Sequence, residues 1–137
     1  MIVFDASTLV SAAFSGDGVP ARAIQHALRE DQVAVSEQVM TELVDVLHRP
    51  SVARFLSPHL RSELLGQLVA LGIPFEPAEP VTDCRDAKDN KYLELALAAR
   101  AGTIVSSDTD LLVLHPWRGV RILRPAEYLG KADNMPP

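Results

Sequence analysis

The sequence predicts a three-layer α/β/α sandwich with a mainly parallel central sheet. Short runs of β-branched or aromatic residues alternate along the chain with longer segments of helical pattern, which is typical of parallel α/β folds. The chain of 137 residues fits one domain, and no internal repeat divides it. We therefore expect a single domain over residues 1–130, followed by a flexible tail over 131–137 that has little to bury.

The first half of the chain is expected to place its helices around two short strands. The expected order is strand 1–5, helix 10–14, helix 20–29, strand 32–35 and helix 37–48. Pro20 suits the first turn of its helix, where a backbone N–H would have no helical partner. Ser36 is expected to cap the helix that follows it, because a serine oxygen accepts from an N–H of the first turn.

The second half of the chain continues the alternation. The expected order is helix 52–56, helix 59–71, strand 73–76, helix 86–101, strand 103–107, helix 109–114 and strand 120–123. Pro50, Gly72 and Gly102 are expected to end the helices before them. The proline-rich segment 74–80 is expected to be an extended connection, and Pro125 to open a terminal turn.

Composition and charge exclude several classes of protein. No apolar run approaches the ~20 residues that a membrane span needs, and the first residues lack the pattern of a secretory signal. Cys84 is the sole cysteine, which excludes an intramolecular disulfide and favours a reducing, cytoplasmic location. The histidines lack the spacing of a structural zinc site. The net charge of −5 argues against an extended basic surface for nucleic acid, although clustered catalytic acids would lower the total in a nuclease too.

Four acidic residues are expected to converge on one edge of the sheet. Asp5 and Asp108 each follow a predicted strand, and parallel strands release such residues at the edge where open α/β sheets bind ligands. Glu42 and Asp89 lie near the starts of helices that leave the same edge. Crowded carboxylates repel one another unless a hard cation neutralises them, so this edge suggests a site for Mg²⁺ or Mn²⁺. A divalent ion at this edge of an α/β sheet in turn suggests a reaction at a phosphate group.

The helical pattern separates these acids from their neighbours. Glu42 lies about 40° beyond the apolar stripe of its helix, whereas Asp45 lies nearly opposite the centre of that stripe and should be solvated. Asp89 projects toward the side of its helix that faces the protein. The polar side of the same helix is expected to carry Asn90, Lys91 and Glu94.

Each acid also has an ordinary structural role open to it. Asp89 suits a helix N-cap, a position for which Asp86 competes, and Asp108 suits the N-cap of helix 109–114. Asp5 suits a turn at the end of a strand. The basic residues are scattered, and the expected solvated ones are Arg22, Arg29, Arg49, Arg54, Lys88 and Lys91. Of these, Arg49 and Arg54 are candidates for a contact with a phosphate backbone.

Several segments in order along the chain resemble the motifs of the PIN-domain ribonucleases, in particular the toxin-like branch related to VapC toxins. The matching segments are 2–10, 36–43 with 46–50, 86–96, 104–112 and the closing 122–129. Ser7 stands where many members carry Asn, and Ser106 stands where Thr is usual. Both departures keep a polar group, so we expect them to tune the site and not to abolish it.

The resemblance implies a metal-dependent endoribonuclease that leaves a 5′-phosphate. Asp5, Glu42, Asp89 and Asp108 would be the catalytic acids that hold one or two Mg²⁺ or Mn²⁺ ions, with Asp110 as a further candidate ligand. Ser7 and Ser106 would orient carboxylates or a phosphate oxygen from behind the metal ligands. The family also implies a homodimer and, in many members, an antitoxin that blocks the site.

Two other functions compete with this interpretation. A haloacid-dehalogenase-like phosphoryl transfer through an aspartyl intermediate would need a second Asp two residues after the first, but position 7 is Ser. A non-catalytic PIN-like module that binds RNA or protein is the other alternative. The intact set of four acids argues against the binding module.

Overall fold

The centre of the molecule is a parallel β-sheet, seen in a computed structural model that describes residues 1–133. Three strands, β1 (Ile2–Phe4), β4 (Thr103–Val105) and β5 (Arg121–Leu123), pair in parallel in the order β1-β4-β5. Two further strands, β2 (Ala34–Val35) and β3 (Ile73–Pro74), also pair in parallel. A parallel bridge between Ile2 and Val33 joins the second pair to β1. The strands therefore run in one direction, and the predicted mainly parallel sheet is confirmed.

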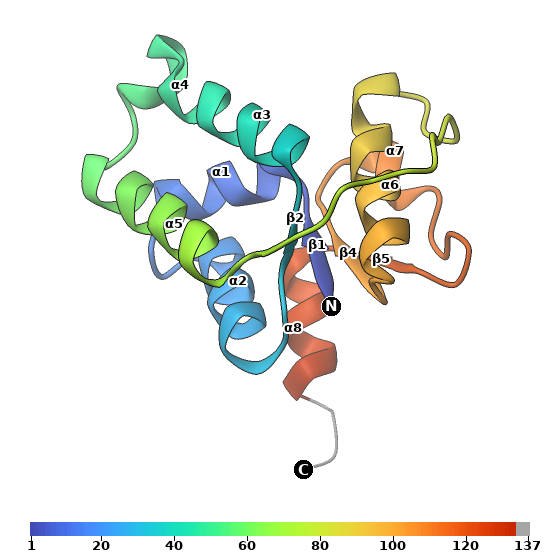
Figure 1. Cartoon of the computed structure of the whole chain (residues 1–137). Helices are drawn as coiled ribbons and strands as arrows, with labels where there is room; N and C mark the ends of the chain where they lie inside the picture. Colours follow the sequence, from blue (N-terminus) through green and yellow to red (C-terminus); the bar gives the residue numbers. More distant parts are fainter. Residues whose placement is uncertain (134–137) are drawn as a thin grey trace.

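Helices cover both faces of this sheet (Figure 1). In chain order they are α1 (Ala6–Phe14), α2 (Val19–Glu30), α3 (Glu37–His48), α4 (Pro50–Ala53), α5 (Pro58–Leu71), the 3-10 helix η1 (Ala87–Asp89), α6 (Asn90–Ala99), α7 (Thr109–Leu112) and α8 (Pro125–Asp133). No helix among these described residues has the length and apolar character that crossing a bilayer requires. Of the tail expected over 131–137, residues 131–133 belong to α8, and residues 134–137 lie outside the described part.

The alternation of side chains along the strands produces two hydrophobic cores. Phe4 of β1 and Val105 of β4 point to one face, where they pack with buried residues of α1, α2, α3, α5 and α8. Val3 and Ile104 point to the other face and pack mainly against Leu93 and its neighbours on α6. Because apolar side chains are buried on both faces, the sheet is the middle layer of the predicted α/β/α sandwich.

Side-chain caps fix where the first helices begin. Asp5 Oδ1 accepts from the Thr8 N–H at 2.9 Å, so α1 begins at Ala6. The helix prediction that started at residue 10 was therefore wrong at its N-terminus, because it overlooked this cap. The predicted cap Ser36 is confirmed, since its hydroxyl accepts from the Val39 N–H at 3.2 Å.

Two further predictions fail near the C-terminal half of the chain. The helix expected over 86–101 is divided into η1 and α6, and α6 ends at Arg100 in the left-handed region (φ 51°), not at Gly102. The terminal turn expected at Pro125 is the helix α8. Burial explains this helix, because Tyr128 packs edge-on against Phe4 of β1, with ring centroids 6.3 Å apart.

Candidate functional site

A cleft of about 420 Å³ opens where β1 and β4 end and the helices that follow them begin. Its lining includes all four acids singled out in the sequence: Asp5, Glu42, Asp89 and Asp108. Asp5 and Asp108 are the N-caps of α1 and α7, Asp89 ends η1, and Glu42 comes from the second turn of α3. The fold thus brings together side chains from four separate segments of the chain.

Asp5 is buried, and each of its two carboxylate oxygens accepts a hydrogen bond. Its Oδ1 caps α1, and its Oδ2 accepts a short hydrogen bond from the hydroxyl of Ser106. Burial raises the pKa of the Asp5 carboxyl, and the hydrogen bonds from Ser106, Thr8 and Ser7 offset only part of that shift. An ionised Asp5 is therefore costly in the absence of a neutralising partner.

Ser106 connects the acid after β1 to the acid after β4. Its hydroxyl is fully buried, donates to Asp5 and accepts from the Asp108 N–H at 2.9 Å. Its own N–H donates to the Leu123 carbonyl of β5 at 2.9 Å, which anchors it to the sheet. Ser106 therefore fixes how Asp5 and Asp108 lie relative to each other.

Asp89 is the least satisfied of the four acids. Its side chain is 8% exposed, and its Oδ2 is buried with no hydrogen-bond partner among the described residues. It does not cap α6, whereas Asp86 accepts from the Lys88 N–H at the start of η1. Burial raises the pKa of Asp89 from its ordinary 3.8 to about 7, helped by a hydrogen bond with Asp108 and by the charges of Asp108, Asp86 and Asp5. A carboxyl in this position needs a proton or a cation.

The cap role proposed for Asp108 is confirmed, and it coexists with the cleft. Its Oδ1 accepts from the Asp110 N–H at 2.9 Å, which starts α7. Asp110 itself is absent from the described lining of the cleft, and its carboxylate pairs with Arg85 at 2.8 Å. The exposed Ser7 lines the cleft beside Asp5.

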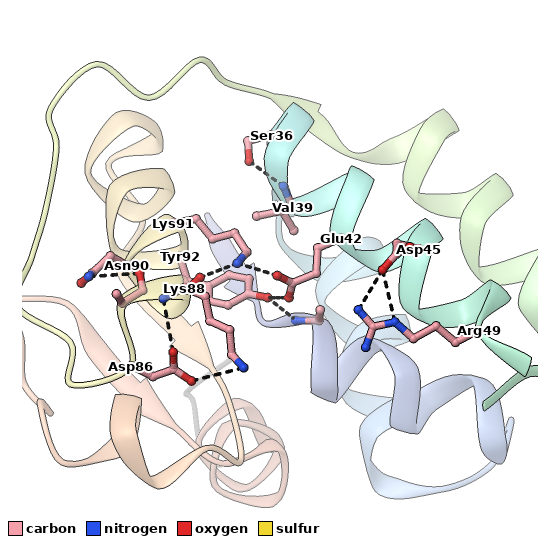
Figure 2. A network of polar contacts seen from close by, with 12 residues as sticks. Ser36, Val39, Glu42, Asp45, Arg49, Asp86, Lys88, Asn90, Lys91 and Tyr92 are labelled. Atoms are coloured by element: carbon pink, nitrogen blue, oxygen red, sulfur yellow. Dashed lines mark hydrogen bonds and ion pairs between the residues drawn. The ribbon is translucent and has the colours of Figure 1, made fainter. Parts of the chain in front are cut away.

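Glu42 is surrounded by hydrogen-bond donors (Figure 2). Its Oε1 accepts from the Tyr92 hydroxyl at 2.6 Å, and its Oε2 lies 2.5 Å from Lys91 Nζ. The Tyr92 hydroxyl in turn accepts from the Ala6 N–H at 3.0 Å. Burial and the neighbouring Glu42 raise the pKa of Tyr92 well above its usual range, so its hydroxyl stays protonated.

Sequence reasoning missed Lys91 and Tyr92. Lys91 was expected in solvent, but its side chain is 13% exposed because it extends toward Glu42, beside a neighbouring pocket that also contains Glu42. A signal existed for Tyr92, since it lies three residues after Asp89 and therefore on the same helix face. Asp45 behaves as predicted, being 64% exposed and paired with Arg49 at 2.8 Å.

Asn90 also departs from the prediction, because it is buried and not on a solvated face. Its side-chain oxygen accepts from the Cys84 N–H at 2.9 Å, and its amide donates to the Ala87 carbonyl at 3.2 Å. These bonds hold the turn that leads into η1. Asn90 thus supports the segment that carries Asp89.

The acids of the cleft fit a hard divalent cation. Carboxylate oxygens are the ligands such ions prefer, and the buried, unpartnered oxygen of Asp89 lies beside Asp5 and Asp108. Within the described residues, no three His, Cys, Asp or Glu side chains lie close enough together to hold a metal ion directly. Mg²⁺ keeps several waters and takes one or two carboxylates directly, so the remaining acid would hold it through water.

Comparison with known proteins agrees with the fold. The model of a protein family described as "PIN domain" matches residues 1–110, a range that includes all four acids. A protein of Methanocaldococcus jannaschii named "Uncharacterized protein MJ1680" is 24% identical over 115 residues, which cover 82% of this chain and 74% of that protein. The family match spans most of the chain. The chain therefore belongs to the PIN-domain family, whose members are generally nuclease-like.

Proposed function

We propose that this protein is a metal-dependent endoribonuclease that hydrolyses RNA phosphodiester bonds. The observation that carries the proposal is the buried, unpartnered Oδ2 of Asp89, a residue that lines the cleft together with Asp5 and Asp108. Membership of a generally nuclease-like family makes a phosphodiester the expected substrate. Together these features favour hydrolysis over a purely binding role.

Asp5, Asp89 and Asp108 would hold the Mg²⁺ or Mn²⁺ ion. When bound, such an ion lowers the pKa of a water and neutralises charge on the phosphate. Ser106 keeps Asp5 and Asp108 in fixed relation, so the protein does not reorganise them when substrate arrives. Ser7, which is exposed at the cleft, would donate to a phosphate oxygen.

Few cations surround the cleft, which bears on how RNA would bind. Lys88 lines it and is 76% exposed, with Asp86 as its partner at 3.7 Å. Lys91 is committed to Glu42, and Arg49 to Asp45. The protein would therefore bind only a small number of phosphates near the scissile bond. Its affinity for RNA should accordingly depend only weakly on salt concentration.

We further propose that the protein is a VapC-like toxin, active as a homodimer in the cytoplasm and blocked by an antitoxin. This part of the proposal is supported by the motifs at 2–10, 36–50, 86–96 and 104–112 and by the resemblance they carry. Asp110 is left out of the proposed ligand set because Arg85 already neutralises it.

Cleavage of a fluorescent RNA by the purified protein tests the central proposal. We expect cleavage with Mg²⁺ or Mn²⁺ and none with EDTA. Asp5→Asn and Asp89→Asn should each lower the rate at least about 100-fold, the upper end of what even outer-shell changes cost at metal sites. Asp45→Asn on the exposed face of α3 is the control and should cleave normally. Undiminished cleavage by Asp89→Asn would refute the proposal, and RNA binding without cleavage by the wild type would favour the non-catalytic module.

A further inference from the structure

Glu42 differs from the other three acids of the cleft because, among the described residues, it alone is paired with a cation. The Tyr92 hydroxyl donates to Oε1 at 2.6 Å, and Lys91 Nζ lies 2.5 Å from Oε2. Asp89, in contrast, has an oxygen that is buried without a partner. The four acids therefore fall into two groups, one carboxylate that is neutralised from within the protein and three that are not.

Lys91 is fixed in its position by more than the ion pair. Its ammonium also donates to the Lys88 carbonyl, and it lies 5.2 Å from the centre of the Tyr92 ring (Figure 2). Its side chain is 13% exposed and that of Glu42 is 29% exposed. A lysine so withdrawn from water needs a charged partner, so Lys91 and Glu42 stabilise each other as a unit.

Tyr92 ties this unit to the rest of the cleft. Its buried hydroxyl accepts from the N–H of Ala6, the residue that follows Asp5, and donates to Glu42. The carboxylate of Glu42 is therefore positioned relative to Asp5 without any ion between them. The other side of the cleft, around Asp89 and Asp108, has no such internal cation among the described residues that line it.

We propose that Lys91 is a built-in cation that takes the place of a metal ion at Glu42, so that the cleft binds one divalent ion, at Asp5, Asp89 and Asp108. Glu42 is then a positioning residue for Lys91 and not a metal ligand. The charges favour this division, because one lysine balances the carboxylate of Glu42 and one divalent ion offsets two of the three charges at Asp5, Asp89 and Asp108. The inference rests on the proposed metal-dependent function and specifies the number of ions.

Titration of the full-length, metal-free protein with Mn²⁺ in a calorimeter tests the assignment. We expect one Mn²⁺ per wild-type chain. Glu42→Gln should keep that ion with an affinity close to that of the wild type, whereas Asp89→Asn should lose at least about 10-fold in affinity. Lys91→Met should bind a second Mn²⁺, or bind the first more tightly, because Glu42 is released.

Lys88→Met is the matched control for Lys91→Met. It removes the same charge three residues earlier in the chain, from a lysine that lines the cleft, but the side chain of Lys88 is exposed and its ammonium lies 3.7 Å from Asp86. Its Mn²⁺ stoichiometry should stay at one. The proposal is overturned if the wild type binds two ions, if Glu42→Gln weakens binding as much as Asp89→Asn, or if the two lysine variants behave alike.

Thermal unfolding in EDTA gives a second readout that needs no metal. Lys91→Met should lower the Tm because it leaves Glu42 unpaired, and the double variant Lys91→Met/Glu42→Gln should recover much of the loss. A Tm loss that the double variant does not recover would contradict the paired unit. RNA cleavage is scored separately, so an inactive wild type that binds one Mn²⁺ refutes the ribonuclease but not this assignment. If the wild type cleaves RNA but Glu42→Gln no longer binds Mn²⁺, the result refutes this assignment and not the ribonuclease.

Discussion

The stability of the metal-free protein should depend on pH through Asp89. This carboxyl is 8% exposed with an unpartnered oxygen, and its pKa is raised from 3.8 to about 7 by burial and by its acidic neighbours. A raised pKa means that the folded protein binds the proton more tightly than the unfolded chain. The stabilisation is therefore fully present below about pH 4 and is lost as the pH rises through 7.

The size of this change in stability follows from the shift in the pKa of Asp89. About three pKa units at about 1.4 kcal/mol each give an upper bound of about 4 kcal/mol. A domain of this kind has only about 5–15 kcal/mol in total. Asp89→Asn carries no ionisable group, so it should escape this loss and be more stable than the wild type at pH 8 in EDTA.

Urea unfolding followed by circular dichroism, from pH 4 to 8.5 in EDTA, measures this difference. The free energy of unfolding of the wild type minus that of Asp89→Asn should fall between about pH 4 and pH 7 and level off above pH 7. Asp45→Asn on exposed α3 should track the wild type at every pH. Saturating Mn²⁺ at pH 8 should restabilise the wild type far more than Asp89→Asn. A difference that is the same at pH 4 and pH 8.5 would refute the reasoning about Asp89.

Three further predictions concern the groups around the cleft. Ser106→Ala removes a fully buried hydroxyl that supports Asp5, so urea unfolding should show a loss of about 1–3 kcal/mol, and calorimetry should show weaker Mn²⁺ binding. Tyr92→Phe leaves the buried N–H of Ala6 without an acceptor and should also cost about 1–3 kcal/mol, whereas an unchanged Tm would contradict the observed bond. Mn²⁺ affinity should increase between pH 6 and pH 8, since Asp89 must lose its proton to bind the ion; a flat profile by calorimetry would oppose the assignment.

Much of this architecture was predictable because local rules and topology agree. Alternating strands and helices imply a parallel sheet, and a parallel sheet directs Asp5 and Asp108 to one edge. Helix starts placed Glu42 and Asp89 at the same edge. The prediction that these four side chains would lie in one place needed only the order of the elements and the direction of the strands.

The features that were not predicted depend on the path of a long side chain and on contacts between distant parts of the chain. A helical wheel gives the direction of Lys91 but not the path of its long side chain, which bends toward Glu42 on another helix. The helix after Pro125 is stabilised by burial of Tyr128 against Phe4, a contact between opposite ends of the chain. The stop at Arg100 is a backbone conformation that a non-glycine residue adopts rarely. None of these features can be predicted from the pattern of neighbouring residues in the sequence.

Diffraction from crystals grown with Mn²⁺, recorded at a wavelength where manganese scatters anomalously, tests the central claim most directly. We expect one anomalous peak in the cleft, in contact with carboxylate oxygens of Asp5, Asp89 or Asp108 and not with Glu42, which stays paired with Lys91. An empty cleft at saturating Mn²⁺, or an ion bound elsewhere on the molecule, would contradict it.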